Sequence, residues 1–269
     1  MLALFDSQSV PSPPELQSPA SFRLPTAKPK LPREILDHFL SSGSRGALSM
    51  SFGNAASIAF DPSASHSAHH QIIEVSEIEW GKNGRLFCGL DEMYCMFKGS
   101  LNNLSRLNKQ YGLSKATNEA MFVIEAYRTL RDRGPYPADQ VLKELEGNFA
   151  FVVFDRKAGS VFAALDANEG MDLYWGTAAD GSLVISDKLE VIKAGCAKSF
   201  APFPPGCMFH SERGLMSFEH PTKKMKAMPR IDSEGVMCGA NFKVDVQSRV
   251  HTMPRVGSEA NWATWGSHA

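Results

Sequence analysis

Three histidines form the densest group of metal-ligating side chains in the sequence: His66, His69 and His70. Their i, i+3, i+4 spacing would bring three imidazoles together on one face of a helix, where they could bind a transition metal. Serine and alanine surround them, however, and no acidic residue stands close by. That composition is more typical of a solvated loop, so we expect no metal here.

A second group supplies oxygen atoms, the ligands that Ca²⁺ and Mg²⁺ prefer. It lies in one short loop and consists of Asp166, Asn168, Glu169 and Asp172. Acidic loops of this kind are usually only solvated, and we expect the same of this one. The sequence therefore predicts neither a metal ion nor any other cofactor.

Two arginines, Arg131 and Arg133, could bind an anion or an acidic partner. They stand in the last turn of a predicted helix, where basic side chains also complement the helix dipole and the free carbonyl groups. We expect this second role. Upstream, Gly112 is expected to end a shorter helix in a left-handed cap, with Tyr111 and Leu113 closing over the core.

The cysteines show no spacing that suggests a zinc site or a redox couple. An odd number cannot pair completely within one chain, and no Cys-x-x-Cys occurs. Reduced thiols of a protein in the cytoplasm or nucleus fit this pattern best. The five are Cys88, Cys95, Cys196, Cys207 and Cys238.

The elements that would position these residues are short strands joined in hairpins, with helices in consecutive pairs. Helices are expected at 31–40, 101–107, 117–133 (with Thr117 as its cap), 137–145 and 187–194, and strands at 1–5, 86–97 (around an Asp91-Glu92 turn), 149–154, 161–165, 173–178, 183–186, 207–210, 215–219 and 236–246. A parallel sheet would need a helix between successive strands, so the pattern predicts antiparallel sheets and an α+β fold.

One domain is predicted for residues 1–247. A proline-rich surface excursion at 7–32 and a loop at 61–84 interrupt it, and a flexible polar tail follows at 248–269. Lys and Arg total 28 against 29 for Asp and Glu, so no net field attracts a nucleic acid. The longest apolar run, Phe149 to Phe154, is far shorter than the roughly 18 residues of a membrane span.

Several ordered motifs resemble the glutaminase domain of class II glutamine amidotransferases. They are Phe97-Lys98-Gly99 with Asn103, Thr117-Asn118-Glu119, Leu145-Glu146-Gly147-Asn148-Phe149, Asp166 through Trp175-Gly176, Ser186-Asp187-Lys188, and Pro204-Pro205-Gly206. The resemblance implies an N-terminal nucleophile hydrolase-like four-layer αββα sandwich, in which two antiparallel sheets pack face to face between helices.

A closer resemblance covers most of the chain. Tyr111-Gly112-Leu113 and Leu130-Arg131-Asp132-Arg133, with the start Met1-Leu2-Ala3 and the run Met237 to Phe242, are similar to the plant aluminium-induced proteins with YGL and LRDR motifs. That family's name records induction of transcripts under stress. Induction by aluminium does not imply that the protein binds aluminium.

The first resemblance implies a catalytic apparatus that this sequence lacks. Class II glutaminases attack with an N-terminal Cys thiolate whose own α-amine serves as base. Leu2 stands at that position, and a residue of its size should also keep Met1 in place. Lys98 replaces the oxyanion-hole Asn although Gly99 remains, Thr117 replaces the carboxylate that would hold the substrate ammonium, and no matching substrate-clamping Arg is found.

The sequence therefore predicts a non-catalytic protein of plant stress, aluminium or hormone responses that binds a protein partner or a small ligand. Its vestigial cleft would comprise Met1, Leu2, Lys98, Gly99, Asn103 and Thr117. The alternative is an amide or glutamine hydrolase of altered chemistry that uses Lys98 in the same cleft, which would require burial to depress the pKa of Lys98. Cys88 followed by Gly89 imitates the start of active members, but Lys98 follows too soon for a sheet to intervene. A homo-oligomer remains possible.

Overall fold

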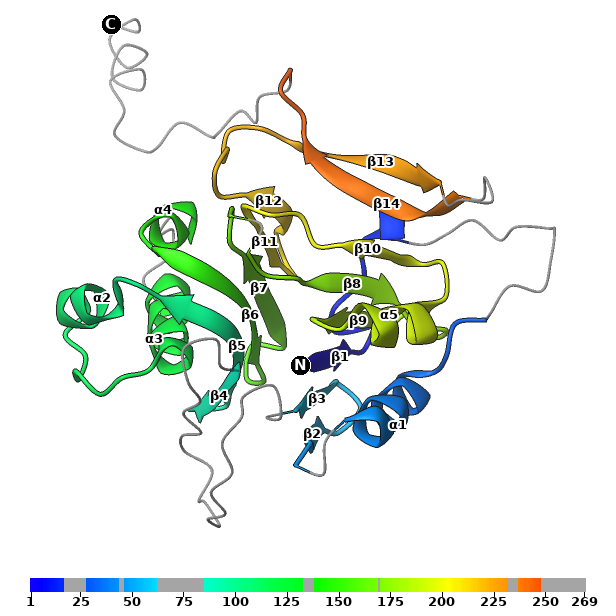
Figure 1. The fold of residues 1–269 in the computed structure, drawn as a ribbon, viewed down its shortest axis with the longest axis horizontal. Coiled ribbons are helices and arrows are strands. Elements are labelled where there is room, and N and C mark those ends of the chain that lie inside the picture. Colours follow the sequence, from blue (N-terminus) through cyan, green and yellow to red (C-terminus); the bar gives the residue numbers. More distant parts are fainter. Residues whose placement is uncertain are drawn as a thin grey trace, which may run out of the picture.

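The structure, a computed structural model, describes residues 1–16, 28–43, 46–61, 85–132, 138–168, 170–231 and 237–247. Within these ranges two antiparallel sheets of six strands lie face to face, and helices cover their outer faces (Figure 1). The predicted α+β sandwich of four layers is confirmed.

The first sheet has the strand order β10-β8-β9-β1-β3-β2. Its strands are β1 (Leu2–Phe5), β2 (Leu48–Phe52), β3 (Ala56–Phe60), β8 (Tyr174–Thr177), β9 (Leu183–Ser186) and β10 (Phe200–Pro202). Strand β1 lies between β9 and β3. Because both of its faces are covered, all its residues are buried, which explains why an uninterrupted apolar run suits this position.

The second sheet has the strand order β12-β11-β7-β6-β5-β4. Its strands are β4 (Arg85–Leu90), β5 (Met93–Leu101), β6 (Gly147–Asp155), β7 (Ser160–Leu165), β11 (Cys207–His210) and β12 (Gly214–Ser217). A separate two-stranded ribbon is formed by β13 (Met225–Ile231) and β14 (Met237–Val244).

Helices α1 (Pro32–Ser42) and α5 (Leu189–Cys196) pack on the outer face of the first sheet, and α2 (Leu104–Gln110), α3 (Glu119–Asp132) and α4 (Ala138–Lys143) pack on that of the second. A short 3-10 helix, η1, spans Pro14–Leu16. Between the sheets, apolar side chains from both inner faces form one core. In this core the ring centroids of Phe5 and Phe154 lie 5.6 Å apart. Each sheet therefore has one inner face and one helix-covered face.

Some expectations need correction. Val10 and Leu16, in the first part of the proline-rich stretch, are fully buried and anchor it to the core, while Ser9 and Pro14 beside them are exposed. Asn118, and not Thr117, caps α3, because its Oδ1 accepts a hydrogen bond of 2.9 Å from the backbone N–H of Met121. Strands β2, β3, β10 and β13 were not predicted.

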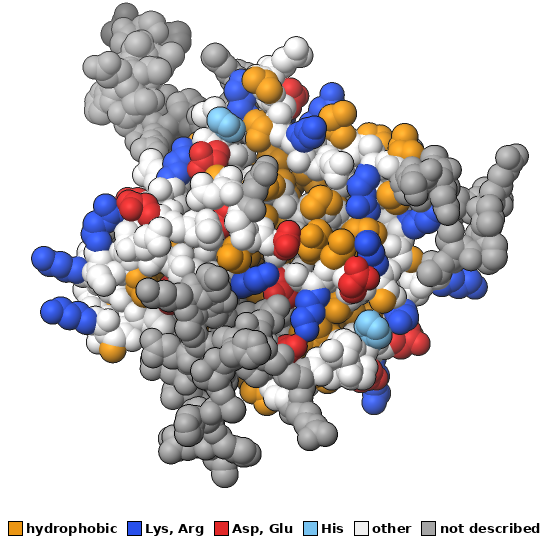
Figure 2. Space-filling view, in the orientation of Figure 1, with side chains coloured by type: hydrophobic (Ala, Val, Ile, Leu, Met, Phe, Trp, Pro, Cys, Tyr) orange, Lys and Arg blue, Asp and Glu red, His pale blue; other side chains and the backbone are white. Residues whose placement is uncertain are grey.

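The face shown in Figure 2 carries Lys and Arg side chains interspersed with Asp and Glu, and hydrophobic side chains show between them. Among the most exposed hydrophobic residues are Met228 and Ile231 on β13. Across the described ranges, every helix falls short of the length and apolar composition that a membrane crossing requires.

Candidate functional site

The α-amino group of Met1 lies at the start of β1, beside the end of the neighbouring strand β9. Its nitrogen is 2.6 Å from Oδ1 of Asp187, the residue that follows β9. Ser186 Oγ donates a hydrogen bond of 2.8 Å to the carbonyl oxygen of Met1, and the backbone N–H of Asp187 reaches the same oxygen at 3.4 Å. Met1 and the Asp187 side chain are both buried. Both the amino group and the carbonyl group of Met1 are thus held by residues at the end of β9.

Lys98 reaches the same carboxylate from the opposite sheet. Its Nζ is 3.4 Å from Oδ2 of Asp187, and 23% of its side chain is exposed. Phe97, the neighbour of Lys98 on β5, belongs to the core on the outer side of the second sheet. Because successive side chains of a strand point to opposite faces, the side chain of Lys98 points into the space between the sheets. Asp187 therefore faces two cations, one from each sheet, and a buried carboxylate is stabilised by such pairing.

The side chain of Met1, and not that of Leu2, faces this inter-sheet site. Met1 belongs to the core between the sheets, whereas Leu2 is buried against the helices α1 and α5. Successive side chains of a strand point to opposite faces, which accounts for the difference. Leu2, which the predicted cleft included, therefore lies on the helix-covered face of β1, and Met1 lies on the inter-sheet side.

Gly99 is required by strand packing. Its φ is +112°, and a Cβ there would lie 2.0 Å from the carbonyl oxygen of Asn148 on β6. Retention of this glycine therefore has a structural cause that is independent of any oxyanion hole.

Asn103 and Thr117 make contacts that hold loops together. Asn103 donates from Nδ2 to the carbonyl of Glu144 at 2.7 Å and accepts from the N–H of Glu146 at 3.2 Å. The carbonyl of Thr117 accepts a hydrogen bond of 2.8 Å from Asn108 Nδ2. The structure thus brings together Met1 and Lys98 from the predicted cleft and gives Asn103 and Thr117 separate roles.

The Tyr111-Gly112-Leu113 motif closes α2, as predicted. Gly112 has φ of +70°, and the N–H of Leu113 donates to the carbonyl of Asn108 at 2.7 Å. The ring of Tyr111 packs edge-on against Phe122 of α3, with centroids 5.1 Å apart. This motif is a helix end that docks on the core.

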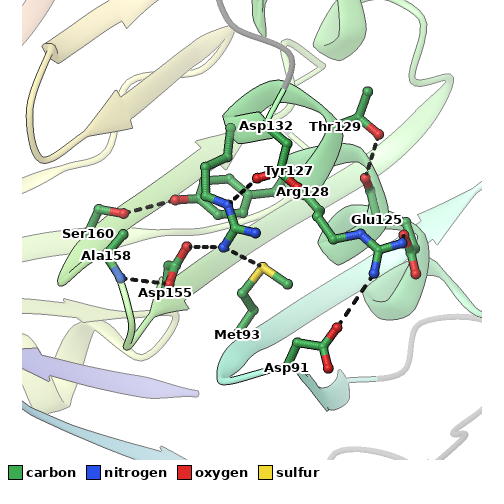
Figure 3. Close-up of polar contacts among 11 residues, drawn as sticks. Asp91, Met93, Glu125, Tyr127, Arg128, Thr129, Asp132, Asp155, Ala158 and Ser160 are labelled. Atoms are coloured by element: carbon green, nitrogen blue, oxygen red, sulfur yellow. Dashed lines mark hydrogen bonds and ion pairs between the residues drawn. The ribbon is translucent and has the colours of Figure 1, made fainter.

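In the LRDR motif, Arg131 makes a side-chain ion pair that the dipole interpretation did not foresee. Its Nη1 donates to Oδ2 of Asp155, and its Nε donates to Oδ1 of Asp132, each at 2.8 Å (Figure 3). Asp155 is fully buried, and its Oδ1 also accepts from the N–H of Ala158 at 2.9 Å. Arg131 thereby joins the end of α3 to the β6–β7 turn, while Leu130 packs on the outer core and Arg133 lies outside the described residues.

These hydrogen bonds also shift the pKa values of Arg131 and Asp132. Those to Asp132 and Asp155 raise the pKa of the Arg131 guanidinium, and the bond from Arg131 lowers the pKa of Asp132. Both shifts favour the charged forms.

Within the acidic loop, the described carboxylates are hydrogen-bonded to neighbouring groups. Asp166 accepts from the N–H groups of Phe149 at 2.6 Å and Asn168 at 2.8 Å, and Asp172 accepts from the Tyr174 hydroxyl at 3.3 Å. No group of potential metal ligands is found within the described ranges. The predicted residues His66, His69, His70 and Glu169 lie outside them.

All five cysteines are buried, and none of them forms a disulfide. Burial, followed by the neighbouring thiol of Cys88, raises the pKa of Cys95, and burial raises the pKa values of Cys196 and Cys207 to about 12. Raised pKa values oppose the thiolate form that a nucleophile needs. Cys88 lies inside β4, opposite Cys95, and is 1% exposed, so it does not form the start of a catalytic strand.

Two carboxylates at the centre of these contacts were missed as site residues. The Ser186-Asp187 pair belonged to a recognised motif, which was a usable signal for Asp187. Asp155 only ends an apolar run in the sequence, and nothing there indicates its pairing with Arg131. At Met1 the amine is bound to the carboxylate of Asp187, and the next residue is Leu2, which carries no nucleophilic group.

Comparisons with known proteins identify relatives of this chain. A family described as "Aluminium induced protein" matches residues 2–244. The stem-specific protein TSJT1 of Nicotiana tabacum is 56% identical over 75 residues, which cover 28% of this chain and 50% of the tobacco protein. A probable glutamine-hydrolyzing asparagine synthetase of Dictyostelium discoideum is 45% identical over 74 residues, covering 28% of this chain and 13% of that protein.

A solved structure of glutamine phosphoribosylpyrophosphate amidotransferase from B. subtilis aligns with a TM-score of 0.41 at 14% identity, covering 62% of this chain and 35% of that one. The chain spans half or less of the length of these relatives. The family match extends over nearly all of both sheets, and the relatives include glutamine-hydrolyzing enzymes. The chain belongs to the aluminium-induced protein family, which is related to the class II glutamine amidotransferase domains.

Proposed function

We propose that this protein is a non-catalytic relative of the glutaminases that acts in plant stress, aluminium or hormone responses by binding a protein partner or a small ligand. The observation that carries the proposal is the ion pair between the Met1 amine and Asp187. A catalytic α-amine must be able to accept a proton from an adjacent nucleophile. Here the amine is held by a buried carboxylate, and the Met1 side chain is buried in the core between the sheets.

A glutaminase assay tests the catalytic half of this proposal. The purified protein is incubated with glutamine, and glutamate release is compared with that of an active asparagine synthetase. We expect no release above the buffer background, and no thermal stabilisation by glutamine. Turnover that disappears in the Lys98→Met variant would contradict the proposal.

A reconstruction series tests whether the lost groups explain the inactivity. Leu2→Cys exposes an N-terminal Cys only if Met1 is removed, which intact-mass measurement reports. We expect Leu2→Cys alone to remain inactive, since Lys98 and Thr117 still differ from the glutaminase pattern. Adding Lys98→Asn and Thr117→Asp should then produce turnover if these positions account for the loss.

One observation favours the alternative of a hydrolase with altered chemistry. Lys98 points between the sheets and keeps 23% of its side chain exposed, so it is accessible to a small substrate. A panel of simple amides, assayed with the wild type and the Lys98→Met variant, tests this alternative. Hydrolysis that depends on Lys98 would establish it.

The cellular site and assembly are part of the same proposal. Five buried cysteines that form no disulfide support a reducing compartment, the cytoplasm or the nucleus. Imaging of a tagged full-length protein tests the compartment. Mass determination in solution tests whether the chain forms a homo-oligomer.

A further inference from the structure

A hollow of about 180 Å³ opens beside the LRDR motif, on the outer side of the second sheet. Polar side chains from three separate segments line it: Tyr127 and Arg131 of α3, Ser160 at the start of β7, and His210, Glu212 and Arg213 at the β11–β12 turn. Lys98 and Met1 lie on the inner side of the sheets and contribute nothing to it. The hollow is therefore a site distinct from the vestigial cleft.

Most of its polar groups can donate hydrogen bonds. Arg131 uses Nε and Nη1 for Asp132 and Asp155, and a guanidinium has further N–H groups. The hydroxyls of Tyr127 and Ser160 are 2.8 Å apart, and only one of their two protons is needed for the bond between them. Arg213 adds a second guanidinium at the exposed edge.

His210 is a further donor. Its Nδ1 accepts a hydrogen bond of 3.2 Å from the backbone N–H of Glu212, which assigns the proton of the neutral ring to Nε2. Burial lowers the pKa of His210, so the ring is neutral at pH 7 and carries that one N–H. Donors thus converge from three segments of the chain.

The charges around the hollow favour a monoanion over a dianion. Arg131 and Arg213 bring two positive charges to the lining, and Glu212 brings one negative charge. Arg131 is already paired with Asp132 and Asp155, so its unused N–H groups can bind a ligand, while these two carboxylates and Glu212 oppose a highly charged one. A phosphate, with close to two negative charges at neutral pH, would therefore be repelled more strongly than a carboxylate.

The rest of the wall is apolar and aromatic. The ring of Phe162 stacks on that of Tyr127 with centroids 5.9 Å apart, and His210 lies 6.1 Å from Phe162 on another side. Leu130 and Ala138 complete the apolar part. The volume is below the roughly 300 Å³ at which pockets for drug-sized ligands begin, so only a small molecule fits.

We propose that this hollow binds a small monocarboxylate with an aromatic or apolar body, the carboxylate meeting Arg213, Arg131 and His210 and the body lying against Phe162 and Leu130. The proposal does not depend on whether the inter-sheet cleft is catalytic. It gives the LRDR motif a second role, because the ion pair with Asp155 holds Arg131 at the wall of the hollow.

Titration with benzoate tests the proposal, with the neutral benzamide and inorganic phosphate as comparison probes. Calorimetry or ligand-observed NMR on the full chain should show saturable one-to-one binding of benzoate, at least about tenfold tighter than benzamide, since a charge-assisted hydrogen bond is about twice as strong as a neutral one. Equal affinity for benzoate and benzamide would overturn it, as would equal or tighter binding of phosphate.

Two variants locate the site. Arg213→Gln should weaken benzoate binding about tenfold, whereas Arg128→Gln, on α3 but outside the hollow, should leave it unchanged. Ala138→Leu fills the hollow without removing a polar group and should abolish binding, while the melting temperature reports that the chain is folded. Unchanged binding in both Arg213→Gln and Ala138→Leu would refute the assignment.

Discussion

The α-amino nitrogen of Met1 lies 2.6 Å from Oδ1 of Asp187, and both side chains are 1% exposed or less. This contact joins the residue that precedes β1 to the residue that follows β9, the strand hydrogen-bonded to β1. A buried ammonium and a buried carboxylate each depend on the other, because neither has water to solvate it. The start of the chain is consequently a structural element of the sheet.

Asp187→Asn should therefore destabilise the fold by about 3 kcal/mol, because it removes the carboxylate that lies 2.6 Å from the buried Met1 ammonium. Lys98→Met should cost less, about 1 kcal/mol, since Lys98 is partly exposed and lies farther away, at 3.4 Å. Urea unfolding measures both. Asp172→Asn, which changes an exposed carboxylate, is the control and should stay within about 0.5 kcal/mol of the wild type. An Asp187→Asn variant as stable as the wild type would show that the pair contributes nothing.

Arg131→Gln should also destabilise the protein, by about 3 kcal/mol, because it removes the guanidinium that pairs with the fully buried carboxylate of Asp155. Arg128→Gln removes a guanidinium of the same helix that is 40% exposed and pairs with Glu125, so it should cost at most about 0.5 kcal/mol. Chemical unfolding at pH 7 compares the two. If both substitutions had equal small effects, Arg131 would be a surface charge and not a clamp.

The sequence predicts the local parts of the fold well. An apolar run such as Met1 to Phe5 marks a buried strand, and Asp180-Gly181 marks a hairpin in which Gly181 has φ of +87°. Strand β2 was missed because it alternates serine with apolar residues and is largely exposed at the sheet edge. Strand β13 was missed because it contains Pro229, which a two-stranded ribbon tolerates beside a shift in register.

The site could be predicted only in part, because its contacts join distant residues. Asp155 lies 24 positions from Arg131, and Asp187 lies 186 positions from Met1, so neither pair leaves a local pattern. Which of Met1 and Leu2 faces the opposite sheet depends on how β1 is seated between its neighbours. Alternation alone shows that the two differ and does not show which is inward.

Protonation of His210 should lower stability in mild acid. Burial lowers its folded-state pKa below the ordinary value of 6.5, outweighing Glu212, which acts in the opposite direction, while Arg213 adds to the lowering. Between that lowered value and about pH 6.5 the unfolded chain binds more protons than the folded one, so stability falls as the pH drops through this window. Unfolding free energies at pH 7.5 and 5.5 should differ less in His210→Gln than in the wild type. His220→Gln, at an exposed position, is the control and should keep the wild-type difference.

Two glycine substitutions separate a packing role from a conformational one. Gly99 and Gly112 both have positive φ, +112° and +70°, but only at Gly99 would a Cβ meet backbone, 2.0 Å from the carbonyl oxygen of Asn148. Gly112→Ala should cost about 1–2 kcal/mol, the penalty of a left-handed conformation. Gly99→Ala should cost a further 1–3 kcal/mol or so, because β5 and β6 must separate to admit the methyl group. Urea denaturation measures the two costs, and hydrogen exchange on β6 should increase only in Gly99→Ala. Equal costs with unchanged exchange would mean that the strands can yield, and the presence of Gly99 beside Lys98 would then need a functional explanation.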